Sequence, residues 1–122
     1  MKGIFVNENG CVPYARLIAG GYKRIETRGR DMLRPCVGQR VAIVQTRRGK
    51  KPMIIGFVDI LDGKKCQGPD HWEAVRDDTL IPPGSLYDDP KRWLYALYNP
   101  EQCKPFPLPS SAIRHGRSWC EF

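Results

Sequence analysis

The sequence has no apolar run long enough to form a membrane span. Its apolar stretches, such as 53–55 and 94–97, are far too short to cross a bilayer. The first eight residues hold one lysine and a short apolar stretch before the chain turns polar, which predicts a first strand and not a signal peptide. We therefore expect a cytoplasmic protein without membrane contact.

Paired cysteines and metal-ligand spacings are also missing. The five cysteines are odd in number and widely spaced, and no CxxC occurs, so a reducing compartment fits better than a secreted disulfide framework. The pair nearest to a metal motif is Cys66 and His71, and two ligands are too few for a zinc site. We expect the cysteines to be small hydrophobic or surface residues. We predict no metal and no cofactor.

Acidic residues are scarce in the first part of the chain. Residues 1–51 hold 12 of the 20 Lys and Arg residues but only 3 of the 13 Asp and Glu residues, and the net charge of the whole chain is +7. This asymmetry indicates a basic face and an anionic partner such as RNA or a nucleotide. A solvated surface that aids solubility is the alternative.

The apolar pattern predicts short strands and one early helix. A helix of about two turns is expected near Pro13, because Tyr14, Leu17 and Ile18 recur at helical spacing and a glycine pair follows. The order of these strands and the helix along the chain predicts an α+β, mainly β fold: a small β-barrel in a single domain over residues 1–122. Strands are expected at residues 2–6, 23–28, 41–46, 53–61, 93–98 and 119–122.

Residues 62–90 are rich in Gly, Pro and Asp, and we interpret them as a long loop and helix excursion over one face of the barrel. One short helix is expected at 70–77, with Asp70 as its cap. Residues 100–109 are interpreted as a proline-rich connection. Gly56, inside a predicted strand, indicates a bulge or a close backbone approach.

The densest polar signal is the stretch 21–28, which contains Lys23, Glu26 and Arg28. Regular strand alternation would place Glu26 and Arg28 on one face and Lys23 with Thr27 on the other. Arg28 has the fork geometry that suits phosphate, and Glu26 can accept a hydrogen bond from an exocyclic amine such as that of cytosine. A desolvated Lys23 can act as a base. The alternative is a structural ion-pair network.

The sequence resembles the ASCH family of the PUA-like superfamily. The motifs that carry the resemblance are a Pro-aromatic helix start, a glycine pair, Lys-x-x-Glu-x-Arg, the strand at 54–59 and a C-terminal aromatic strand. In this sequence the first three are Pro13-Tyr14, Gly20-Gly21, and Lys23 with Glu26 and Arg28. The resemblance implies a barrel with a cleft, between helix and barrel, that binds RNA or nucleotides. Some members are similar to amidohydrolases acting on N4-acetylcytidine, and others are reported as ribonucleases.

The resemblance also implies site residues. The family's catalytic lysine falls on Lys23, the threonine of that site falls on Glu26, and the nearest candidate for its glutamate is Glu73. A small amidohydrolase or ribonuclease would therefore use Lys23 and Glu73 as catalytic residues. The candidates for substrate binding are Tyr14, Glu26, Arg28, Ser85, Arg117 and Ser118. A turn-stabilising role for Ser85 and a solvated turn around Arg117 remain alternatives.

Three functions stay open at this point. The first is an RNA- or nucleotide-binding domain with a charged cleft around Lys23, Glu26 and Arg28, and the glutamate in place of threonine favours it over the amidase. The second is a small enzyme with Lys23 as its base, and the third is a protein-interaction domain whose ion pairs are structural. The basic tip at 47–51 either contacts a nucleic-acid backbone or blocks edge pairing.

Overall fold

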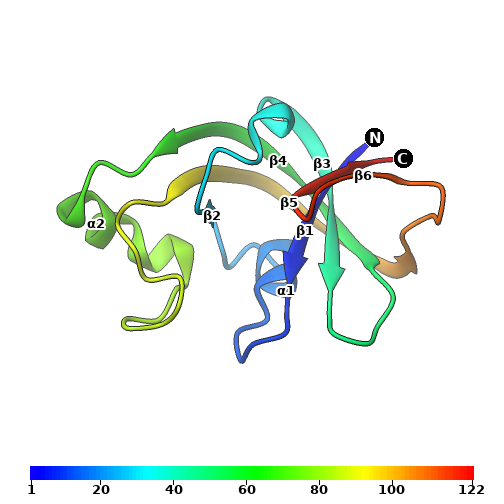
Figure 1. The fold of residues 1–122 in the computed structure, drawn as a ribbon, viewed down its shortest axis with the longest axis horizontal. Coiled ribbons are helices and arrows are strands. Elements are labelled where there is room, and N and C mark those ends of the chain that lie inside the picture. The colour runs from blue at the N-terminus through cyan, green and yellow to red at the C-terminus, as the bar shows by residue number, and fades with distance from the viewer.

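The computed structural model describes all 122 residues and contains one seven-stranded mixed sheet with two helices (Figure 1). The strands are β1 (Lys2–Asn7), β2 (Ile25–Arg28), β3 (Gln39–Thr46), β4 (Met53–Lys65), β5 (Trp93–Pro107), β6 (Ile113–His115) and β7 (Trp119–Glu121). The helices are α1 (Tyr14–Ala19) and α2 (Pro69–Thr79), and a 3-10 turn spans Arg34–Cys36. Neither α-helix is long and apolar enough to cross a membrane.

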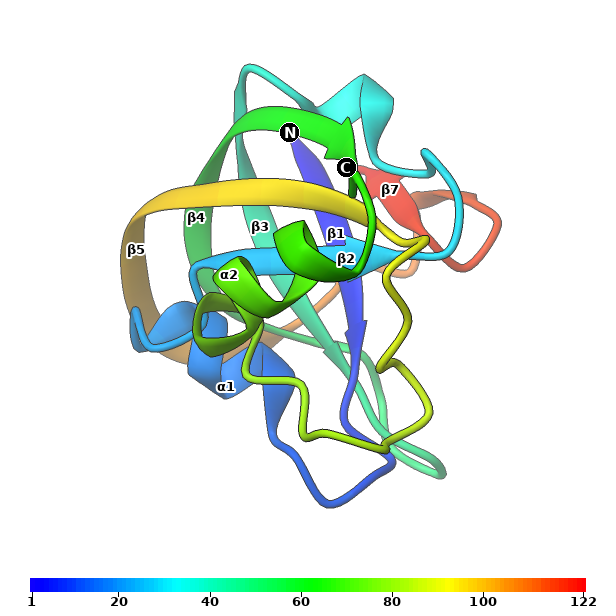
Figure 2. The same ribbon diagram turned by 90° about the vertical axis from the view of Figure 1, so that its left-hand side faces the viewer.

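The strands follow the order β2-β5-β4-β3-β1-β7-β6. β1 pairs in parallel with β3 and antiparallel with β7, so the first strand lies inside the sheet. The sheet is strongly curved (Figure 2). Its two edge strands, β2 and β6, do not pair with each other. The mainly β class is therefore confirmed, whereas closure into a barrel is not.

The sheet buries apolar side chains on both of its faces. Ile4 and Val6 of β1 belong to the cluster that also contains Ala15 and Ile18 of α1, whereas Phe5 belongs to a second cluster. This division follows from the two-residue period of a strand, which turns successive side chains to opposite faces. The helix α1 covers the first of these clusters and thereby lies beside the end of β1.

Helix α1 is close to its prediction. It begins at Tyr14 directly after Pro13 and buries Ala15, Ile18 and Ala19. The chain leaves it through Gly21, whose φ of 82° lies in the left-handed region that glycine adopts without strain. This turn leads the chain back toward the sheet just before β2.

Two strands are longer than predicted. β4 continues to Lys65, and β5 continues to Pro107 through the segment that we interpreted as a connection. β2 pairs with β5 only as far as Ala96, so the rest of β5 has a free edge where proline removes no ladder hydrogen bond. The short strand β6 had no counterpart among the sequence predictions.

The irregularity predicted at Gly56 is present. The register between β4 and β5 shifts between Ile54 and Gly56. A Cβ atom at Gly56 would lie 2.3 Å from the carbonyl oxygen of Glu101, so the two backbones approach too closely for any larger residue.

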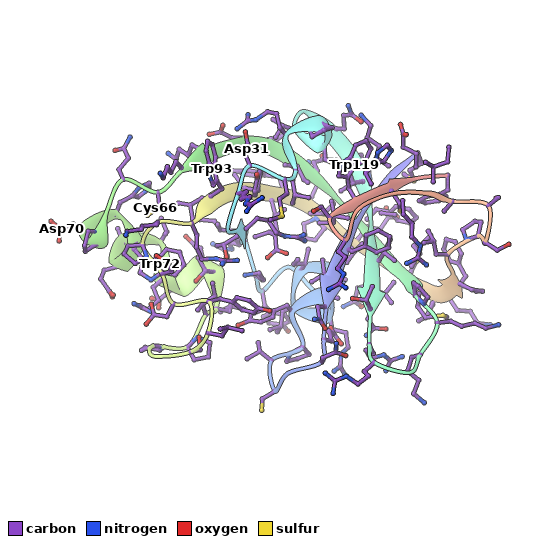
Figure 3. The ribbon with its side chains drawn as sticks, in the orientation of Figure 1. Asp31, Cys66, Asp70, Trp72, Trp93 and Trp119 are labelled. Carbon is purple, nitrogen blue, oxygen red and sulfur yellow. The ribbon has the colours of Figure 1, made fainter.

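The segment between β4 and β5 contains α2, which is longer than the predicted helix. Asp70 does not cap it: the N-cap position is Gly68, no side chain caps the helix there, and Asp70 lies at the outer end of the molecule (Figure 3). Trp72 packs in a buried cluster with Cys66, Ile81 and Leu94 and is 2% exposed.

The loop at 80–90 is attached to α2 through Asp88. This carboxylate accepts hydrogen bonds from the indole nitrogen of Trp72 and from the backbone of Gly84, both at 2.7 Å, and pairs with Arg76 at 2.9 Å. The loop therefore has a defined position, and it brings Ile81 and the residues after it toward β1 and β2.

Candidate functional site

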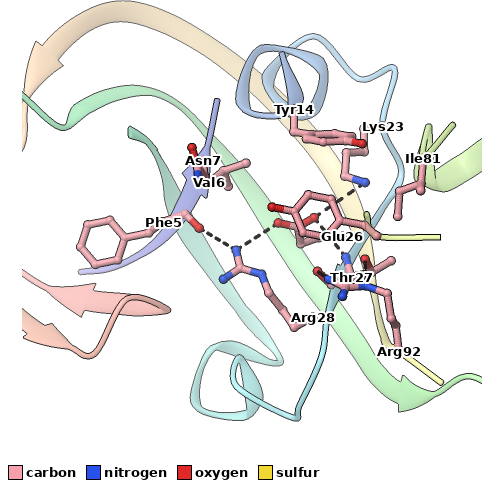
Figure 4. A pocket seen from close by; sticks show the side chains of 11 residues that line it. Phe5, Val6, Asn7, Tyr14, Lys23, Glu26, Thr27, Arg28, Ile81 and Arg92 are labelled. Atoms are coloured by element: carbon pink, nitrogen blue, oxygen red, sulfur yellow. Dashed lines mark hydrogen bonds and ion pairs between the residues drawn. The ribbon is translucent and has the colours of Figure 1, made fainter. Parts of the chain in front are cut away.

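A cavity of about 150 Å³ opens between β1, α1, β2 and the loop that precedes β5 (Figure 4). We call it the central cavity. Its lining residues are Phe5, Val6, Asn7, Tyr14, Lys23, Glu26, Thr27, Arg28, Ile81, Tyr87 and Arg92. The charged motif of the sequence thus lies in a concave site and not on an open strand face.

Lys23 is the most deeply buried charged residue of the site, with 2% of its surface exposed. Its Nζ donates a hydrogen bond to the carbonyl oxygen of Thr79 and lies 4.9 Å from the ring centroid of Tyr14 and 3.7 Å from Oε1 of Glu26. Burial lowers the pKa of Lys23 to about 8, although the Glu26 carboxylate opposes this shift.

Lys23 and Glu26 share one cavity, which corrects the prediction that they face opposite ways. β2 begins only at Ile25, so Lys23 lies in the turn before the strand, where its backbone N–H bonds to Leu17 of α1. The two-residue alternation therefore does not extend back to Lys23. Thr27 lines the cavity as well, together with Glu26.

Glu26 is the carboxylate at the centre of the cavity and is 7% exposed. Its Oε1 accepts the backbone N–H of Thr27 at 3.0 Å, and its Oε2 accepts an Arg28 guanidinium N–H at 3.0 Å. Burial alone would raise the pKa of Glu26, but the charges of Arg28 and Lys23 outweigh it and hold the pKa below its usual range. Glu26 is therefore ionised at neutral pH.

Arg28 connects the cavity to β1. The same Nη2 that contacts Glu26 donates to the carbonyl oxygen of Phe5 at 2.6 Å. Arg28 is thus held from two sides, which fixes the orientation of the Glu26 carboxylate.

Arg92 lines the cavity and was missed by the sequence analysis. Its Nε donates to Thr27 Oγ1 at 2.7 Å and its Nη2 to the Thr27 carbonyl oxygen at 3.0 Å, while its guanidinium lies 5.0 Å from the ring centroid of Tyr87. It makes no ion pair with a carboxylate. The pairing of Arg28 with Trp93 across β2 and β5 brings it here. The sequence did hold a signal for Arg92, since it is a basic residue directly before the predicted aromatic strand at 93–98.

Two tyrosine rings complete the lining. Tyr14 and Tyr87 contact each other edge to face, with centroids 6.2 Å apart and an angle of 62° between the rings. Burial and the Glu26 charge raise the pKa of Tyr14, so its hydroxyl remains protonated at neutral pH. The site therefore combines aromatic surface with three cations and one carboxylate.

Four of the predicted site residues lie elsewhere. Glu73 is exposed on α2 and pairs with Arg76 at 2.5 Å, so its predicted catalytic role has no support in this geometry. Ser85 donates its hydroxyl to the Pro82 carbonyl oxygen at 2.7 Å, as a turn-stabilising serine would. Arg117 and Ser118 lie in the turn between β6 and β7 and do not line the cavity.

The structure offers no evident metal site. No three side chains of the types His, Cys, Asp and Glu come together in an arrangement that could hold a metal ion. The ionisable groups of the central cavity are its lysine, arginines, carboxylate and tyrosines.

Solved structures with the same architecture exist. A crystal structure of ASCH from Zymomonas mobilis matches with a TM-score of 0.67 and 20% identity, covering 87% of this chain and 73% of that one. The chain has the ASCH fold. Two variants of the Zymomonas mobilis protein match the fold with TM-scores of 0.63: a Ser-to-Ala variant at 18% identity and a Tyr-to-Phe variant at 20%. The match with the Ser-to-Ala variant covers 86% of this chain and 73% of that one, and the match with the Tyr-to-Phe variant covers 88% and 77%.

The ASCH fold agrees with the resemblance inferred from residues 13–28. No protein-family model and no curated protein matches the chain. At the identity of the structural matches the likeness establishes the fold alone, and the central cavity is the feature that bears on function.

Proposed function

We propose that the protein binds RNA, or a nucleotide, through the central cavity. The observation that carries this proposal is the surplus of positive charge: Lys23, Arg28 and Arg92 surround the single carboxylate of Glu26. A concave, half-polar site with two uncompensated positive charges favours an anionic ligand.

Arg92 is the group that would hold the phosphate. Lys23 and Arg28 both face Glu26, at 3.7 and 3.0 Å, and share its single negative charge. Arg92 uses Nε and Nη2 on Thr27 and has no carboxylate partner, which leaves Nη1 as a charged donor for a ligand. This assigns the phosphate to Arg92, where the sequence had suggested Arg28.

A nucleobase fits the remainder of the cavity. A volume of about 150 Å³ holds one small aromatic ring. Tyr14 and Tyr87 offer ring faces for stacking. Each oxygen of Glu26 accepts one hydrogen bond within the protein and has a further lone pair, so Glu26 can accept from an exocyclic amine of the base.

The test compares Arg92→Gln with Lys91→Gln, an adjacent exposed residue with the same loss of charge. Arg92→Gln should weaken binding of a nucleoside 5′-monophosphate roughly tenfold to a hundredfold, because it removes a charged hydrogen bond, and should leave the corresponding nucleoside unaffected. Calorimetric titration of the four nucleosides and their monophosphates measures this. Equal affinities of the two variants for the monophosphate would refute the role of Arg92.

A second function, hydrolysis, is favoured by the state of Lys23. With a pKa of about 8, roughly a tenth of this lysine is neutral at pH 7 and able to take a proton from an attacking water or hydroxyl. An amidohydrolase of this kind would split N4-acetylcytidine with water into acetate and cytidine. Product formation that rises with pH around 8 would establish catalysis, and its absence with intact binding would leave a binding domain.

A third function, protein interaction, would make the charges purely structural. The ion pairs of Glu26 with Lys23 and Arg28 fit this reading, but Arg92 does not, because it has no carboxylate partner. If Arg92→Gln changes the affinity of none of the nucleosides and monophosphates, the protein-interaction function is favoured.

A further inference from the structure

A second basic surface lies at the tip of the β3–β4 hairpin. Arg47, Arg48, Lys50 and Lys51 are all exposed. None of the four makes an ion pair. We call these four residues the basic hairpin. Four uncompensated charges within five positions are a strong local attraction for a polyanion.

Next to the basic hairpin, a groove of about 460 Å³ lies between α1 and strands β4 and β5. We call it the hairpin groove. Arg16 and Arg47 are its cationic lining residues, while Met53 and Ile55 contribute apolar surface. Arg16 is already paired with Glu8 at 3.2 Å, so the free charge at the groove comes from Arg47. An unpaired cation beside the four charges of the basic hairpin suits the phosphate backbone of a nucleic-acid strand.

The groove and the central cavity are neighbours across α1 and the end of β1. Tyr14 of α1 lines the cavity and Arg16 lines the groove. The loop at 8–12, which leads from β1 to α1, is bonded to the hairpin: Glu8 donates its backbone N–H to the Thr46 carbonyl oxygen at 2.8 Å, and Asn9 accepts a hydrogen bond from the backbone of Arg48. Figure 1 shows this loop between the hairpin and the loop at 80–90, along the lower side of the molecule.

We propose that the hairpin groove and the basic hairpin bind the backbone of a single-stranded RNA of which one base occupies the central cavity. This rests on the proposed function and names its ligand as an oligonucleotide. The cavity holds a single ring, so a base can enter only when it is unstacked, which is the state of bases in single-stranded RNA. The charges at 47–51 then contact phosphates of the neighbouring nucleotides.

The test compares two pairs of consecutive lysines at different places in the protein. Lys50→Gln/Lys51→Gln changes the basic hairpin, and Lys64→Gln/Lys65→Gln removes the same charge from exposed residues at the far end of β4. Binding of a labelled RNA octamer and of a nucleoside monophosphate is measured at about 50 and 200 mM salt, where backbone contacts respond strongly.

The hairpin variant should weaken octamer binding and lower the slope of log K against log salt by about 1.4, since each single-strand phosphate contact contributes about 0.7. It should leave monophosphate binding unchanged, and the Lys64/Lys65 variant should keep the slope of the unmodified protein.

The outcomes separate the two proposals. If the octamer responds equally to both lysine-pair variants while the monophosphate still binds through Arg92, the hairpin inference fails and the proposed function stands. If neither ligand binds the unmodified protein, the proposed function itself fails. A DNA octamer that binds as tightly as the RNA octamer would overturn the assignment to RNA.

Discussion

The central cavity and the basic hairpin both carry excess positive charge, but the charges are buried and paired in the cavity and exposed and unpaired in the hairpin. In the cavity, Lys23 is almost fully buried and has three partners: Glu26, the ring of Tyr14 and the Thr79 carbonyl. In the hairpin, Lys50 and Lys51 are exposed and make no ion pair. Buried charge depends on fixed protein partners and contributes to stability and chemistry, whereas exposed charge is screened by salt and contributes to association.

The largest effect that separates the two regions should come from Glu26→Gln. It leaves Lys23, Arg28 and Arg92 around a neutral side chain, and breaking a buried ion pair by removing one partner costs about 3–5 kcal/mol. Urea denaturation at pH 7 measures the loss.

Two controls belong to this experiment. Glu101→Gln removes an exposed partner of Arg40, and Lys50→Gln/Lys51→Gln removes hairpin charge; each should stay within about 0.5 kcal/mol of the unmodified protein. A cost for Glu26→Gln as small as that of the controls would contradict the view that the cavity charges depend on one another.

The next effect is the pH dependence of stability that Lys23 contributes. Its pKa is lowered to about 8 in the folded protein from 10.5, so between these values the unfolded chain binds more protons and stability rises with pH. The rise should reach about 3 kcal/mol and should be missing in Lys23→Met. Denaturant midpoints of both proteins from pH 7 to 10.5 give the difference. If the two plots of stability against pH were parallel, burial would not lower the pKa of Lys23.

A smaller and more local effect is expected in the wall of the cavity. Asp88→Ala removes the acceptor that holds Trp72, Gly84 and Arg76, so amides in the loop at 80–90 should exchange several-fold faster while the sheet amides keep their rates. Asp70→Ala is the control, because Asp70 is an exposed carboxylate without a partner.

The contacts of Asp88 should also resist acid. The backbone N–H of Gly84 is the largest cause that lowers the pKa of Asp88 to about 2, so in the unmodified protein the Asp88 contacts should persist until the pH falls toward that value.

The contrast between near and distant residues also explains what the sequence could predict. Tyr14, Lys23, Glu26 and Arg28 lie within one helix, one turn and one strand, so the polar stretch and the spacing of the motif were enough to single them out. Only the alternation at Lys23 misled, because the strand starts two residues later than predicted. The early helix, the bulge at Gly56 and most strands were predictable for the same local reason.

Arg92 and Tyr87 reach the cavity from a distant part of the chain. Their position depends on the pairing of β2 with β5 and on the Asp88 contacts, and neither has a periodic signal. The extension of β5 to Pro107 was equally hidden, because prolines usually end strands and are tolerated here only along the free edge. Glu73 was proposed from the resemblance alone, and α2 turns it toward solvent.

The position of β1 between β3 and β7 has a consequence for how the chain folds. The amino group of Met1 donates to the carbonyl oxygen of Phe122 at 2.7 Å, a contact between residues 121 positions apart. During synthesis β1 can pair with β3 early, but its other edge must wait until β7 leaves the ribosome. Contacts over such separations slow folding. Until β7 has been synthesised, the nascent protein exposes an unpaired edge of β1, where chaperone binding or aggregation competes with completion of the sheet.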